Sequence, residues 1–162
     1  MMVEAQHVTP STFSSALIYA PFAYMQISTE TGDYIAEIVH LKDGIRRPTI
    51  RCVKSCKSKS NLSDNIDYNP VSMSLMGDLT PTLLVTTWAS GSAYRVFTYR
   101  IADSGVDRVL ALSSWTVPFF GVNTRYRYIA VTEGTSRFDR RWITYIWRGG
   151  RFARKPGYPA VR

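Results

Sequence analysis

Arginine and aromatic residues are interleaved in the last third of the chain. Arg125, Tyr126, Arg127 and Tyr128 are consecutive, and on a β-strand this alternation places both arginines on one face and both tyrosines on the other. Two later segments, 137–142 and 148–155, mix the same residue types. A guanidinium pairs with carboxylates and phosphates and stacks on aromatic rings, so the pattern is typical of a surface that binds an anionic macromolecule.

Three interpretations of this pattern remain open. Arginine and aromatic residues are enriched at the hot spots of protein interfaces, which favours an acidic protein partner. Aromatic platforms beside cations also bind single-stranded nucleic acid, because every base offers a flat face for stacking. The same alternation arises without a partner when tyrosine and tryptophan fill a β core and arginine covers the outside.

A protein partner is the leading interpretation, and it assigns roles to nine residues. Arg side chains would serve as charge anchors, whereas the two tryptophans would be apolar contacts or members of the core. The set is Arg125, Arg127, Arg137, Arg140, Arg141, Trp142, Trp147, Arg148 and Arg151.

Net charge supports an anionic partner. Residues 1–81 carry seven basic and eight acidic side chains, whereas residues 82–162 carry thirteen basic and four acidic ones, so the two halves have net charges of −1 and +9. Twelve of those thirteen basic residues are arginine. Solubility alone is the competing explanation of such a charge.

Cys52 and Cys56 are the only two cysteines. They cannot build a structural zinc site, which needs four ligands. In an extended strand they would lie about 13 Å apart, so a disulfide requires a turn or bend between them. The polar, basic surroundings favour a disulfide that closes a local loop, with two ordinary thiols as the alternative.

No catalytic motif is present. The sequence contains no nucleophile elbow, phosphate-binding loop or His-Glu-x-x-His motif. His40 has Glu37 and Asp43 nearby, but an ordinary histidine is favoured there. Asp64 and Asp67 fall in a polar segment rather than in a desolvated cleft. We therefore expect a protein that is not an enzyme and that holds no cofactor or metal.

Short β-type runs alternate with Gly, Pro, Asn and Asp turns along the whole chain. About nine or ten strands and almost no helical period predict an all-β fold of antiparallel sheets, either a β-sandwich or a truncated propeller-like assembly. We expect a polar leader at 1–13, one β domain over 14–155 with a long polar loop at 54–69, and a C-terminal tail at 156–162. The apolar run 14–27 contains Pro21 and is too short to span a membrane.

Two segments carry a resemblance to a known family. Residues 77–85 (GDLTPTLLV) and 145–152 (YIWRGGRF) resemble the GD-x-x-P-x-L-V-V strand and the Y-x-W-x-G-G-x-F hairpin of FG-GAP and VCBS-type β-propeller repeats in bacterial surface and periplasmic proteins. The calcium loop of such repeats is reduced to Asp78, so calcium is not expected. The chain is too short for a full propeller at about 40 residues per blade.

The resemblance implies a reduced bacterial domain outside the cytoplasm. Small domains of this kind are sometimes inhibitors or immunity proteins against secreted toxins. No signal peptide is visible at residues 1–4, so a periplasmic or secreted location assumes that one was removed; otherwise the cytoplasm is expected. The leading hypothesis is a protein-interaction module, and the alternative is a nucleic-acid-binding β domain that uses the same basic face.

Overall fold

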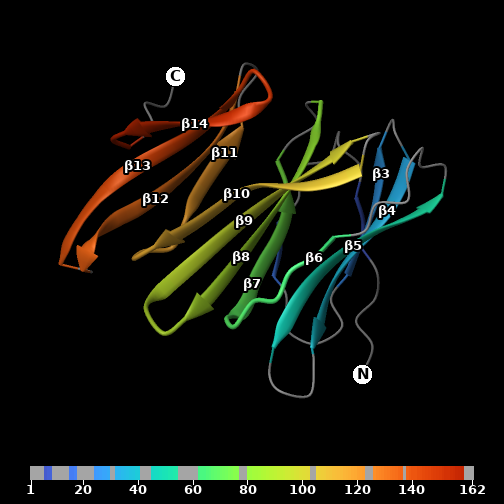
Figure 1. The fold of residues 1–162 in the computed structure, drawn as a ribbon, viewed down its shortest axis with the longest axis horizontal. Helices are drawn as coiled ribbons and strands as arrows, with labels where there is room; N and C mark the ends of the chain where they lie inside the picture. The colour runs from blue at the N-terminus through green and yellow to red at the C-terminus, as the bar shows by residue number, and fades with distance from the viewer. Residues whose placement is uncertain are drawn as a thin grey trace.

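The computed structural model describes residues 6–8, 15–17, 24–29, 32–40, 45–54, 62–76, 80–102, 105–122, 126–136 and 138–158. All regular structure in these ranges is β, which confirms the all-β prediction, and the strands form three sheets (Figure 1). No helix in the described ranges is long and apolar enough to cross a membrane.

The first sheet is built from the N-terminal part of the chain. Its strand order is β1-β3-β4-β5-β6, and all its pairings are antiparallel except the parallel pair β1–β3. β3 and β4 form a hairpin, and β5 pairs with the other side of β4. The strands are β1 (Gln6–Val8), β3 (Tyr24–Thr29), β4 (Gly32–His40), β5 (Arg46–Lys54) and β6 (Leu62–Ser63).

The second sheet has the order β10-β9-β8-β7-β2, and the third has the order β11-β12-β13-β14. Apart from β2, consecutive strands are neighbours, as short hairpin connections allow. The second sheet contains β2 (Ser15–Leu17), β7 (Asn69–Leu75), β8 (Thr82–Ser90), β9 (Ala93–Ala102) and β10 (Gly105–Ser114). The third contains β11 (Phe119–Val122), β12 (Arg127–Ser136), β13 (Asp139–Arg148) and β14 (Arg151–Pro156).

The β13–β14 turn depends on glycine. Gly149 and Gly150 have φ values of +59° and +85°, a left-handed conformation that the two central residues of a tight hairpin require. The glycine pair makes this turn and holds Arg148 directly opposite Arg151 in the register of the two strands.

The second sheet is buried on both faces because it lies between the other two (Figure 1). Seven consecutive residues of β8, from 82 to 88, are buried. Leu84 and Trp88 pack in a cluster with the first sheet, whereas Leu83 and Val85 pack in a cluster with the third. A strand covered on both sides has no solvent face, which explains why β8 is a continuous run of apolar and β-branched residues.

Three predicted boundaries differ from the structure. β1 lies within the predicted leader. The predicted loop 54–69 contains β6 and the buried Ile66, whose backbone exchanges hydrogen bonds of 2.7 and 3.1 Å with Arg46. The predicted tail begins inside β14, and its Gly157 is tied to β13 by two hydrogen bonds, from its amide to the Trp142 carbonyl and from Thr144 Oγ1 to its own carbonyl. Residues 55–61 lie outside the described ranges.

Arg127 was predicted to be a surface charge anchor, but it is buried between the second and third sheets with 2% of its surface exposed. Its Nη1 donates to the Pro81 carbonyl at 2.6 Å and its Nη2 to the Thr80 carbonyl at 3.4 Å. Its guanidinium lies 5.8 Å from the centre of the Trp147 ring. Burial lowers the pKa of Arg127 to about 10, which still leaves it protonated at neutral pH. Arg127 therefore joins two sheets and does not face a partner.

Replacing Arg127 with alanine should lower the free energy of unfolding by about 2–4 kcal/mol, because the change leaves a cavity and two carbonyls without their donor. Arg148→Ala is the matched control, since Arg148 follows Trp147, the register partner of Arg127, but is exposed, and it should change stability by less than about 0.5 kcal/mol. Urea unfolding measures both. Equal losses in the two variants would contradict the role given to Arg127.

Candidate functional site on the outer face of the third sheet

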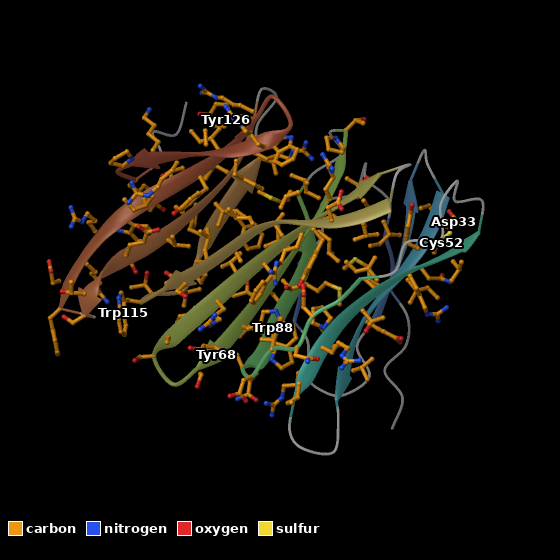
Figure 2. The ribbon with its side chains drawn as sticks, viewed as in Figure 1. Asp33, Cys52, Tyr68, Trp88, Trp115 and Tyr126 are labelled. Carbon is orange, nitrogen blue, oxygen red and sulfur yellow. The ribbon has the colours of Figure 1, made fainter. Side chains whose placement is uncertain are left out.

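The third sheet turns one face toward the second sheet and the other face away from it. Ile129, Val131 and Trp147 belong to the cluster shared with the second sheet. Because side chains alternate along a strand, the residues between them lie on the opposite face, which we call the outer face. Tyr128 and Trp142 lie on this face, and Tyr126 lies at one end of it (Figure 2).

Five aromatic rings form a continuous row on the outer face. Trp142 meets Tyr158 edge to face with 4.7 Å between ring centroids, and Tyr158 lies 5.9 Å from Phe119. Phe119 stacks on Tyr128 at 6.5 Å, and Tyr128 lies 6.4 Å from Tyr126. Each such pair contributes about 0.5–1.5 kcal/mol beyond simple burial. We call these five residues the aromatic row.

The aromatic row joins parts of the chain that are far apart in sequence. Its members come from β11, β12, β13 and the two segments that precede β12 and follow β14. Phe119 and Tyr158 keep 46% and 49% of their surface exposed, so the row presents apolar area to solvent. Beneath it, Ala130 and Thr144 are almost completely buried. The row therefore rests on a packed sheet, and Phe119 and Tyr158 are its accessible members.

Basic side chains flank the aromatic row. The guanidinium of Arg148 lies 5.6 Å from the centre of the Tyr126 ring. Arg151 stands opposite Arg148, and the alternation of β13 and β14 places Arg140 and Lys155 on the same face. All four are exposed. Aromatic edges and cations thus share one face of the third sheet.

Burial raises the pKa of Tyr128, and the neighbouring Tyr158 and Tyr126 add to the shift. Tyr128 is therefore neutral at physiological pH. Its hydroxyl keeps a proton that it can donate to an acceptor on a partner.

The structure divides the nine predicted contact residues into three groups. Four lie on the outer face, namely Arg140, Trp142, Arg148 and Arg151. Three lie on the opposite side of the sheet, namely Arg127, Arg141 and Trp147. Arg125 and Arg137 lie outside the described residues.

Trp147, predicted as a partner contact or a core residue, belongs to the core. It is 7% exposed, and its ring packs edge to face on Phe152 at 5.1 Å. Phe119 and Tyr158 were not predicted as contacts. Their meeting depends on the order of β11 and β14 at opposite edges of the sheet, and no local pattern in the sequence signals it.

Cys52 lies in β5, half-buried and packed against the core shared by the first and second sheets (Figure 2). Cys56 lies outside the described residues, so the predicted disulfide stays a prediction. In the described ranges, no three His, Cys, Asp or Glu side chains are grouped closely enough to hold a metal ion.

Glu133 is held by two donors on the face of the third sheet that carries Arg141. The Tyr145 hydroxyl donates to its Oε1 at 2.6 Å, and Nη2 of Arg154 donates to its Oε2 at 3.0 Å. Burial alone would raise the pKa of Glu133, but these hydrogen bonds and the charges of Arg154 and Arg141 together lower it. Glu133 is therefore ionised at neutral pH.

The chain matches no protein-family model, no curated protein and no solved structure. The resemblance to propeller repeats therefore stays a prediction, and the chemistry of the described residues carries the functional inference.

Replacing Tyr145 with phenylalanine should raise the pKa of Glu133, because it removes a hydrogen bond that favours the carboxylate. The lowered pKa means that Glu133 stabilises the fold above its unfolded-state pKa and that this stabilisation is lost as the pH falls through the folded-state pKa. NMR titration of the Glu133 carboxyl carbon measures the shift. Tyr94→Phe is the control and should leave it unchanged, whereas an unchanged pKa in Tyr145→Phe would contradict the assignment.

Proposed function

We propose that this chain is a non-enzymatic protein-interaction module that binds an acidic protein partner through the outer face of the third sheet. The observation that carries the proposal is the aromatic row flanked by four exposed cations, on a face that neither of the other two described sheets covers. Aromatic and arginine side chains supply most of the binding energy at protein interfaces, and an acidic surface would pair with the cations.

The packing of the rings favours a protein over nucleic acid. Trp142 and Tyr158 meet edge to face, so each uses part of its ring surface on the other. The guanidinium of Arg148 occupies one face of Tyr126. Bases of single-stranded nucleic acid need free ring faces on which to stack, whereas a protein surface can pack against ring edges.

An inhibitor or immunity-type role is the most concrete form of this proposal. It is supported by the resemblance to reduced extracytoplasmic bacterial domains, which also favours a periplasmic or secreted location. A second support is rigidity, since the outer face belongs to a hydrogen-bonded sheet backed by a packed core. Complexes of inhibitors with their targets typically form between such pre-organised surfaces.

The test is capture of a partner from nuclease-treated extract of the source organism, followed by measurement of its affinity. The double variant Arg148→Ala/Arg151→Ala should weaken binding by about 10- to 100-fold, because it removes two adjacent cations beside the aromatic row. Arg51→Ala is the matched control, since Arg51 is an exposed arginine of the first sheet, and it should bind like the unaltered chain.

Two outcomes would contradict the proposal. One is loss of all captured material after nuclease treatment, together with binding to single-stranded oligonucleotides that weakens steeply as salt rises; this outcome assigns the face to nucleic acid. The other is a protein partner whose affinity is unchanged by the double variant, which would place the interface elsewhere on the molecule.

A further inference from the structure

A groove with a volume of about 530 Å³ lies between the second and third sheets, on the side of the third sheet away from the outer face. This size falls within the range of about 300–1,000 Å³ that is typical of small-molecule sites. Figure 2 labels two of its residues, Tyr68 and Trp115. The described lining is Tyr68, Ala93, Tyr94, Ala111, Leu112, Ser113, Ser114, Trp115, Thr132, Glu133, Gly134 and Tyr145.

Aromatic side chains from two strands and two adjoining segments converge on the groove. Tyr68 comes from the segment before β7, Tyr94 from β9, Trp115 from the segment after β10, and Tyr145 from β13. The indole N–H of Trp115 donates to the Gly134 carbonyl at 3.2 Å, which fixes the ring at the junction of the two sheets. These rings offer flat apolar surfaces to a ligand.

Glu133 is the only charged residue among the described residues that line the groove. Each of its oxygens accepts one hydrogen bond, from Tyr145 or from Arg154. A carboxylate oxygen accepts two, so the side chain retains capacity for donors on a ligand. The ligand that this carboxylate selects must therefore carry hydroxyl or N–H groups.

The charge around Glu133 disfavours both kinds of ion. Arg154 lies 3.0 Å from the Glu133 carboxylate, and Arg141 is the register partner of Glu133 on β13. A cation bound to this carboxylate would therefore meet two positive neighbours. Neither arginine is among the described residues that line the groove, so an anion there would meet the ionised carboxylate as the only charge of the lining. A neutral ligand with several hydroxyl groups avoids both costs and can also use the Ser113 hydroxyl in the lining.

We propose that this groove binds a neutral saccharide unit. A sugar ring has a flat apolar C–H face that packs on aromatic rings, and a rim of hydroxyls that donate to a carboxylate. Glu133 would accept those hydroxyls, while Trp115 and the tyrosines would form the platform. The inference is independent of the partner proposed for the outer face, because the two sites use opposite faces of the third sheet.

The test begins with a glycan array that includes neutral, acidic and amino sugars, and continues with titration of the best neutral oligosaccharide by NMR. We expect saturable shifts of the Trp115 indole N–H and of the Tyr145 backbone amide. Ala111→Trp places a large side chain in the groove from an exposed position, and it should weaken binding at least 10-fold. Glu133→Gln should weaken it as well, because it removes the ionised acceptor.

Arg148→Ala/Arg151→Ala is the control, and it should bind the saccharide like the unaltered chain, whatever it does to the protein partner. Circular dichroism of each variant confirms that it is folded, and the chemical-shift map of the unaltered chain provides a readout that needs no variant. Binding of no neutral glycan, preference for an acidic or amino sugar, or shifts that fall outside the groove would each overturn the proposal.

Discussion

Burial of the second sheet on both of its faces is the constraint on which the rest of the structure depends. A sheet with two apolar faces is stable only when each face is covered, and here the first and third sheets supply the two covers. Polar groups inside this stack must be satisfied locally. The Trp88 indole donates to Thr86 at 2.9 Å, and Arg127 donates to the Thr80 and Pro81 carbonyls just before β8. The same requirement that sheets cover one another therefore decides which arginine is buried and which are exposed.

The two candidate sites follow from the position of the third sheet. One of its faces is needed to cover the second sheet, so its other face is the one that carries the aromatic row and the exposed cations. The groove is the space between the second and third sheets that side chains do not fill. Glu133 lies in its lining, together with the Tyr145 hydroxyl that donates to it. A basic chain thus presents a cationic aromatic surface on one side of this sheet and an aromatic groove with a carboxylate on the other.

The fold class could be predicted from the sequence because strand periodicity and turn residues are local signals. The Gly149-Gly150 pair is typical of a tight hairpin turn, and the β-branched, apolar run at 83–88 predicts a strand, although its burial on both faces was not predicted. The candidate site could be predicted only in part. Arg148 and Trp142 lie on the outer face. Arg127 comes from a similar alternation of arginine and aromatic residues, but its side chain points toward the second sheet. Which face of a strand is covered depends on the sheet that docks there, and that information is not local.

We infer that the three sheets form one cooperative stack that holds the third sheet as a rigid platform. Native-state hydrogen exchange of Val131→Ala tests it most directly, because Val131 is fully buried in the cluster between the second and third sheets. Because the two sheets share this cluster, we expect faster exchange in β8 of the second sheet as well as in β12, by a similar factor. Faster exchange confined to the third sheet, with β8 unchanged, would show that the sheets open independently and would contradict the claim.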